Sequence, residues 1–184
     1  GRVAALTDAG RKRLRNEDAF VCEPPLFAVA DGMGGAQAGE VASRLAIAAL
    51  VDTDAGTLSG SERVRMLIEQ ANRRVYDRAA EDQTAAGMGT TLTAAFVESD
   101  TVWVGHVGDS RAYRVRDGAI AQITNDHSLV AELVRSGRLT PEEAEVHPQR
   151  SVITRALGTE DEVEIDVFPE AAEPGDVYLI CSDG

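Results

Sequence analysis

Hydrophobic positions recur along this chain with two different periods. Between residues 37 and 75 the apolar residues are spaced three or four apart, which is typical of helices that bury one face. One predicted helix covers residues 37–50, with Val41, Leu45 and Ala48 on its buried face. A second begins after Ser59, which forms a capping-box pattern with Glu62. Its apolar face carries Val64, Leu67, Ile68, Ala71 and Val75.

The middle of the chain changes to short runs rich in β-branched and aromatic residues, which predict strands. These runs cover residues 90–97, 101–107, 112–115 and 120–124. Asp117-Gly118 separates the last two and favours a tight hairpin turn, so we expect an antiparallel meander. Other predicted strands cover residues 3–6, 21–22, 26–30, 163–168 and 177–181, and short helices are expected at 128–135 and after Thr140-Pro141. Helices that are grouped rather than alternating with strands indicate an α+β fold.

Composition narrows the possible partners. The 184 residues suit one domain spanning 1–184, and 43% hydrophobic content excludes a disordered chain. The net charge of -13 argues against nucleic-acid partners and anionic lipid. No apolar run approaches the roughly 18 residues that span a bilayer, so we expect membrane contact only through a segment of a longer parent. Two cysteines without a disulfide framework favour a reducing compartment, and we expect a cytoplasmic protein.

Three predicted strands end in an aspartate next to glycine. These aspartates are Asp31, Asp109 and Asp183. Turn chemistry alone favours Asp-Gly, so each has an ordinary structural explanation. The glycines after Asp31 do not form a dinucleotide fingerprint, because position 37 is Gln. Aspartates that converge at strand ends repel one another unless cations bind, and all-oxygen ligands select hard ions such as Mg²⁺ or Mn²⁺.

Eight short motifs, taken in order, give the chain a specific resemblance to the metal-dependent protein phosphatases, the type 2C serine/threonine phosphatases, and especially to their bacterial branch. They occupy residues 13–18, 30–35, 87–91, 107–111, 124–128, 147–150, 154–158 and 181–184. The resemblance implies an αββα sandwich of two antiparallel sheets flanked by helices, with its C-terminal part missing. It also implies hydrolysis of phosphoserine and phosphothreonine by a water activated on two Mn²⁺ or Mg²⁺ ions.

The resemblance assigns roles to particular residues. Asp31 matches the carboxylate that bridges both metals, and the Gly32 carbonyl matches a backbone ligand. Asp18 matches a further ligand, direct or through water, with Glu17 supporting it. Asp183 matches a ligand of the other metal, and together with Asp109 it matches a third, weaker metal site. Arg13 matches the guanidinium that clamps the substrate phosphate, a role that suits a planar fork of donors.

Histidine chemistry departs from part of the family. Many eukaryotic members have a histidine, proposed as the general acid, at the position of Met33. His106 lies inside a predicted strand and His127 in a polar turn, and both are interpreted as structural. We therefore name no side-chain acid and expect a metal-bound water to protonate the leaving group.

The resemblance also implies a flap at residues 129–155, next to the active site, as the source of substrate selectivity. A plain helical hairpin on the surface would have the same pattern. We expect phosphorylated proteins as partners, among them a serine/threonine kinase, and a monomeric state. The family continues beyond Ser-Asp-Gly to an Asp-Asn pair that completes the second metal site, so we expect a fragment of a longer protein rather than a defective domain.

Two other classes of function stay open at this point. One is a non-catalytic pseudophosphatase or phosphoprotein-binding regulatory module, and the other is an acidic scaffold without an ion site. The acidic set at positions 18, 31, 109 and 183 argues against decay of the site. A scaffold without an ion site would show no stabilisation by metal.

Overall fold

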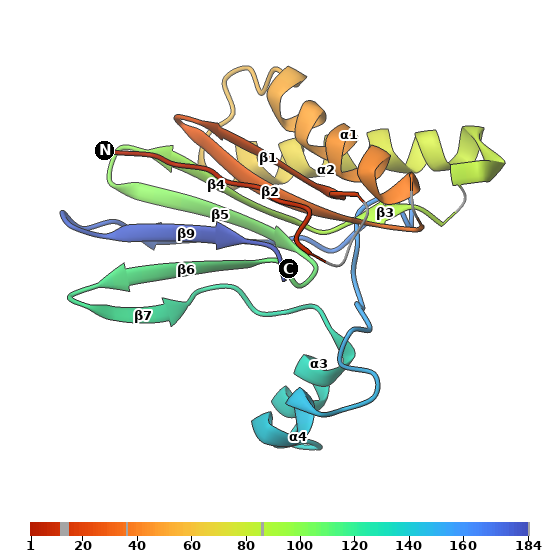
Figure 1. Cartoon of the computed structure of the whole chain (residues 1–184). Coiled ribbons are helices and arrows are strands. Elements are labelled where there is room, and N and C mark those ends of the chain that lie inside the picture. Colours follow the sequence, from red (N-terminus) through yellow and green to blue (C-terminus); the bar gives the residue numbers. More distant parts are fainter. Residues whose placement is uncertain (12–14, 36, 86, 184) are drawn as a thin grey trace.

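The computed structural model describes residues 1–11, 15–35, 37–85 and 87–183. Two antiparallel sheets lie face to face, and two long helices cover the outer face of the larger sheet (Figure 1). This arrangement confirms the predicted α+β class and the two-sheet sandwich. The described residues form no helical layer over the smaller sheet.

The larger sheet contains six strands. They are β1 (Asp18–Glu23), β2 (Leu26–Met33), β3 (Gly89–Thr90), β4 (Leu92–Glu98), β5 (Thr101–Val107) and β8 (Asp166–Ala171). Hydrogen-bonded neighbours follow the order β1-β2-β4-β5-β8, and the short β3 pairs with the end of β2. The predicted strand at 90–97 is therefore two strands, separated at Thr91.

The smaller sheet contains β6 (Arg111–Arg116), β7 (Ala119–Gln122) and β9 (Val177–Cys181), in the order β7-β6-β9. Asp117 and Gly118 both have positive φ, 51° and 77°, which confirms the predicted tight turn between β6 and β7. On β9, Val177 and Leu179 are 58% and 48% exposed, so they face away from the sandwich. Tyr178 and Ile180 alternate with them and pack between the sheets.

Helix α1 (Ala38–Asp52) packs on β1 and β2 through small side chains. Ala42, Ala46 and Ala49 are fully buried, while Val41 is 37% exposed. The predicted buried stripe is therefore wrong at Val41, while Leu45 packs partly buried against the core and the helix itself is confirmed. Alanines on the buried face let the helix axis approach the sheet closely, which a row of larger side chains would prevent.

Helix α2 (Gly60–Glu81) lies beside α1 over β5 and β8, and the 3-10 helix Gln83–Ala85 follows it. Its predicted apolar face is confirmed, since Val64, Leu67 and Ile68 are buried. The predicted capping box is wrong, because the Ser59 side chain makes no cap hydrogen bond. The Glu98 carboxylate, from the end of β4, accepts the Gly60 N–H instead, at 3.1 and 3.2 Å.

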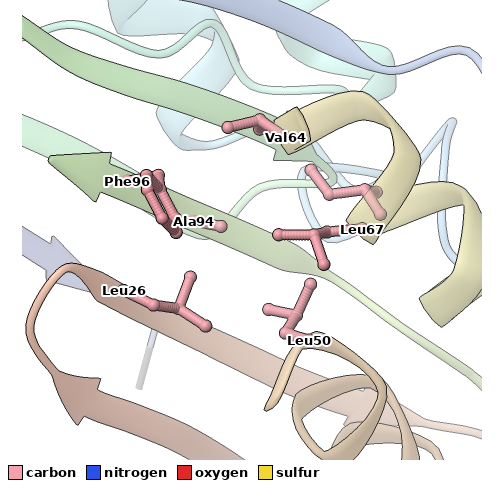
Figure 2. A pocket seen from close by; sticks show the side chains of 7 residues that line it. Leu26, Leu50, Val64, Leu67, Ala94 and Phe96 are labelled. Atoms are coloured by element: carbon pink, nitrogen blue, oxygen red, sulfur yellow. The ribbon is translucent and has the colours of Figure 1, made fainter. Parts of the chain in front are cut away.

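The main core lies between the two helices and the larger sheet. Figure 2 shows an apolar pocket there, lined entirely by hydrophobic side chains of α1, α2, β2 and β4. A smaller cluster between the two sheets is centred on Ala95, Val102 and Val104. Gly105 of β5 lies under α2, and an added Cβ there would run into Val64 and Ile68. The close packing of α2 on β5 therefore depends on a residue without a side chain.

Two short helices, α3 (Leu129–Arg135) and α4 (Pro141–Glu145), project away from the sheets (Figure 1). Neither contains a buried residue. Thr140 and Glu143 form a capping box at the start of α4, as the Thr-Pro pattern suggests. No helix in the described part of the chain is both long and apolar enough to cross a membrane.

The predicted strand at residues 3–6 is wrong. That segment has no regular secondary structure, and Val3 and Leu6 are 52% and 93% exposed. Its apolar residues suit a strand locally, but no described strand pairs with it, and an isolated strand leaves its backbone groups unpaired.

Candidate metal centre

Asp18 and Asp31 are direct cross-strand partners at the open end of the β1-β2 hairpin, away from its turn. Residues paired in this way have Cβ atoms about 5 Å apart on the same face of the sheet, and like charges at that separation repel. Ala28 and Ala30 of β2 face the helices, so Asp31, one residue on, faces the space between the two sheets. The hairpin thus brings two carboxylates together on the side where the second sheet packs.

Thr91 anchors the backbone of Asp31. The Asp31 N–H donates to Thr91 Oγ1 at 3.0 Å, and the Thr91 N–H donates to the Asp31 carbonyl at 2.9 Å. Thr91 Oγ1 also lies 2.6 Å from the Ser110 hydroxyl, next to Asp109. One buried side chain therefore links the two strand ends that carry Asp31 and Asp109. This role of Thr91 was not predicted from the sequence, although Thr91 lies in one of the motifs that carry the resemblance.

A contact between two glycines brings α1 onto β2 beside Asp31. A Cβ at Gly32 would collide with the backbone of Gly39, in the first turn of α1. A Cβ at Gly39 would lie 2.7 Å from Glu17 Oε1 and 3.0 Å from the Gly32 oxygen. The Gly32 N–H donates to the Glu17 carbonyl at 3.1 Å. The backbone carbonyl of Glu17 therefore fixes Gly32. The role of Gly39 was not predicted, and the available signal for it in the sequence was a glycine inside a predicted helix.

The end of β9 completes the cluster. The Ser182 hydroxyl donates to Asp18 Oδ2 at 2.8 Å, although the two residues are 164 positions apart. Asp183 follows directly and is exposed. Asp109 lies in the bend between β5 and β6. Burial, together with the negative charges of Asp183 and Asp126, raises the pKa of Asp109 to about 6.

The arrowheads of β5 and β9 and the start of β6 meet at one end of the sandwich (Figure 1). The aspartates gathered there offer carboxylate oxygens, the ligands that Mg²⁺ and Mn²⁺ prefer. Among the described residues no group of three or more His, Cys, Asp or Glu side chains could hold a metal ion. The carboxylates meet in pairs instead, which suits a hard ion that keeps most of its waters and takes only one or two carboxylates.

The remaining predicted residues are elsewhere. Arg13, assigned to the substrate phosphate, lies outside the described residues. His106 and His127 are buried, with ring centroids 4.7 Å apart, behind the Gly108-Asp109 turn. Burial, together with the neighbouring His127, lowers the pKa of His106 to about 4. His106 is therefore neutral near pH 7 and its Nε2 donates to the Asn125 carbonyl at 2.9 Å.

Asn72 of α2 is another residue that the sequence analysis missed. Its Oδ1 accepts the Gly158 N–H at 2.8 Å, and its Nδ2 donates to the carbonyls of Glu160 and Asp161. Leu157, just before this loop, exchanges two backbone hydrogen bonds with Thr90. Asn72 therefore ties the loop to α2 beside the strand that precedes Thr91. The apolar face of α2 gave no sign of a polar residue with a partner 86 positions away.

We predict that Asp109→Asn stabilises the metal-free protein at pH 7.5 by about 1 kcal/mol, after allowance for the partial exposure of the carboxyl group. The folded-state pKa of about 6 lies above the unfolded value of about 3.9. The ionised carboxylate therefore lowers the free energy of unfolding. This loss is absent below pH 4, where the group is protonated in both states, and complete above pH 6. Urea unfolding in chelator at pH 4 and pH 7.5 measures the difference.

Asp100→Asn is the control, because Asp100 is exposed at the opposite end of β5 and its substitution should leave stability unchanged. The prediction would be contradicted if Asp109→Asn and the wild type had the same free energy of unfolding at both pH values.

We predict that Thr91→Val costs about 1–3 kcal/mol of the free energy of unfolding, because the Asp31 N–H loses its acceptor in a buried place. Thr91→Ser keeps the hydroxyl and loses one methyl group, so it should cost about 1 kcal/mol. Chemical unfolding of both variants measures the difference. A Val variant no less stable than the Ser variant would show that the hydroxyl does not anchor Asp31.

Comparison with known proteins agrees with this arrangement. The family model described as "Protein phosphatase 2C" matches residues 8–184. Serine/threonine protein phosphatase PstP of Mycobacterium tuberculosis is 45% identical over 185 residues, which are 100% of this chain and 36% of PstP. Serine/threonine phosphatase stp of Listeria monocytogenes is 41% identical, covering 97% of this chain and 75% of that protein.

Solved structures show the same fold. A crystal structure of the catalytic domain of PstP in complex with two manganese ions matches with a TM-score of 0.88 and 42% identity, covering 98% of this chain and 76% of that one. The chain spans about a third of the length of PstP. The match of the family model over nearly the whole chain, together with these relatives, shows that the chain belongs to the protein phosphatase 2C family.

Proposed function

We propose that this protein hydrolyses phosphoserine and phosphothreonine in proteins, in a reaction that depends on Mn²⁺ or Mg²⁺. One observation carries the proposal. Strands distant in the sequence bring Asp18, Asp31, Asp109 and the Ser182-Asp183 pair to one end of the sandwich. In a protein phosphatase 2C chain, these are oxygen ligands of the kind that a two-metal phosphatase needs. Relatives named as serine/threonine phosphatases support the same activity.

We assign the metal ligands as follows. Asp31 and the Gly32 carbonyl hold the central position, because both lie on β2 where Thr91, Glu17 and α1 fix the backbone. Asp18 and Asp183 flank them, joined through the Ser182 hydroxyl. Asp109 and Asp183 form the third, weaker position, supported by the effect of Asp183 on the pKa of Asp109. The bound ions would supply an activated water as nucleophile and neutralise the charge on the phosphate.

The chain's own groups provide positioning rather than covalent chemistry. Cys22 and Cys181 are free thiols on β1 and β9, and neither lies in a phosphate-binding loop. His106 is buried and neutral near pH 7, with Nε2 committed to the Asn125 carbonyl, so it cannot reach a leaving group. A mechanism in which water attacks and no side chain becomes phosphorylated fits these placements.

Arg13 is proposed to bind the substrate phosphate with a bidentate pair of hydrogen bonds. The support is its position five residues before Asp18, in the motif Arg13-x-x-Asn-Glu-Asp18. An arginine suits this task better than a lysine, because its planar fork matches two phosphate oxygens at once.

Phosphorylated proteins are the substrate class that the relatives' names support. We further propose that a serine/threonine kinase is among them, and that the protein is a cytoplasmic monomer. Residues 129–155, which contain the projecting helices α3 and α4, are proposed to select substrates. Their side chains are largely free to contact a partner, since neither helix contains a buried residue.

We predict that p-nitrophenyl phosphate hydrolysis requires added Mn²⁺ and falls at least 100-fold in Asp31→Asn, because the variant lacks the central charged ligand. Steady-state kinetics with Mn²⁺ and with chelator test this. Asp100→Asn is the matched control and should keep wild-type activity, since the residue is exposed at the other end of the sheet. Mn²⁺ binding without turnover would favour a pseudophosphatase instead.

We predict that Arg13→Ala raises KM about tenfold and leaves Mn²⁺ binding unchanged, because the arginine contacts substrate and not metal. Arg11→Ala removes a neighbouring positive charge and should change KM less than twofold. Phosphopeptide kinetics together with calorimetric Mn²⁺ titration separate the two effects. Equal changes in both variants would mean that only the general charge of this segment matters.

A further inference from the structure

His127 is buried and holds the Gly108-Asp109 turn from two sides. The Nδ1 atom of its ring accepts the Gly108 N–H at 3.1 Å, and the backbone N–H of His127 donates to the Gly108 carbonyl at 2.8 Å. The side chain is only 3% exposed. Both backbone groups of Gly108, the residue immediately before Asp109, are therefore bound to one histidine.

The hydrogen-bond partners define the tautomer of the ring. A backbone N–H can only donate, so Nδ1 carries no proton. Burial lowers the pKa of His127, which keeps the ring neutral, and its single proton is then on Nε2. Nε2 donates to Oδ2 of Asp166, at the start of β8, at 2.9 Å, while the Arg155 guanidinium lies farther from Nε2, at 3.3 Å, and has no acceptor for this proton. Asp166 therefore selects the tautomer that leaves Nδ1 free to hold Gly108.

The turn has little room to move away from this contact. Gly108 has φ of +109°, and a Cβ there would lie 2.7 Å from the Cβ of Thr91. Thr91 is the residue that anchors Asp31. The turn is thus packed against Thr91 on one side and bound to His127 on the other.

The backbone of His127 also belongs to the base of the segment that carries α3 and α4. The Thr154 N–H donates to the His127 carbonyl at 2.9 Å, and the adjacent Ser128 and Ile153 form a β-bridge. Arg155, next along the returning chain, donates to Asp166 Oδ1 at 3.2 Å. Both ends of residues 129–155 therefore meet at His127 and its partner Asp166.

We propose that His127 is a positioning residue for Asp109. Its Nδ1 holds the Gly108-Asp109 turn so that the Asp109 carboxylate faces Asp183, and its Nε2, bound to Asp166, keeps the ring in the required tautomer. The proposal rests on the proposed function, in that Asp109 and Asp183 bind a metal ion. Loss of an outer-shell hydrogen-bond partner that orients a metal ligand typically lowers metal affinity by about ten- to a hundredfold.

Two substitutions separate the two ring nitrogens. His127→Asn places an amide oxygen near the position of Nδ1 and can still accept the Gly108 N–H. His127→Gln places an amide nitrogen near the position of Nε2 and can still donate to Asp166. Each variant loses one buried hydrogen bond, so a merely structural histidine predicts similar losses of thermal stability and no difference in metal binding.

The readout is Mn²⁺ binding measured by calorimetry on wild type, both variants and Asp109→Asn. The Asp109→Asn titration identifies the binding event that needs Asp109. For that event we expect the Mn²⁺ affinity of His127→Asn to stay within about threefold of the wild-type affinity, and that of His127→Gln to fall about tenfold. Thermal unfolding in chelator should be similar for the two His127 variants.

Equal Mn²⁺ affinities of the two His127 variants would overturn the positioning role. A wild type in which no Mn²⁺ binding event depends on Asp109 would instead overturn the proposed metal site. Should both variants fail to fold, Asp166→Ala keeps His127 and removes the group that selects its tautomer. In that case we expect Asp166→Ala to weaken the Mn²⁺ binding event that needs Asp109. An unchanged Mn²⁺ affinity for that event would contradict the proposal.

Discussion

The burial and crowding of carboxylates at one end of the sandwich are the main physical constraint on this structure. Asp18 and Asp31 are paired across β1 and β2, and Asp109 lies near Asp183. Burial first, and the negative charges of Asp183 and Asp126 after it, raise the pKa of Asp109, so folding holds its carboxylate ionised at a cost. Such an arrangement gains stability when cations bind. The same carboxylates therefore destabilise the metal-free fold and give the site its ability to bind cations.

The supporting contacts are mostly neutral hydrogen bonds and glycine contacts. Thr91 holds Asp31 through its hydroxyl, His127 holds Gly108, and Gly32 and Gly39 let α1 approach β2. Neutral groups can fix the backbone beside an aspartate without neutralising its charge. Hydrogen bonds from arginine to these carboxylates would compete with a metal ion, and arginines of the smaller sheet pair instead with acids such as Glu170 and Asp176.

Local patterns succeeded where one element buries one face. The apolar stripe of α2 and the Asp117-Gly118 turn were both correct, because period and turn chemistry are properties of a few neighbouring residues. Local patterns failed where a residue of another element, or a different set of residues, makes the predicted contact. Glu98 replaces Ser59 at the start of α2, and small alanines rather than Val41 face the sheet in α1. At residues 3–6 a suitable strand sequence found no partner among the described strands.

The sequence by itself determined the chemistry of the site: three predicted strands that end in an aspartate next to glycine, and an ordered set of motifs belonging to one family. Only the tertiary structure decided which of these groups meet, and which residues hold them. Ser182 reaches Asp18 across 164 positions, Asn72 reaches Gly158 across 86, and His127 reaches Asp166 across 39. Such contacts depend on how sheets and helices pack, because polar partners distant in the chain leave no periodic signal in the sequence.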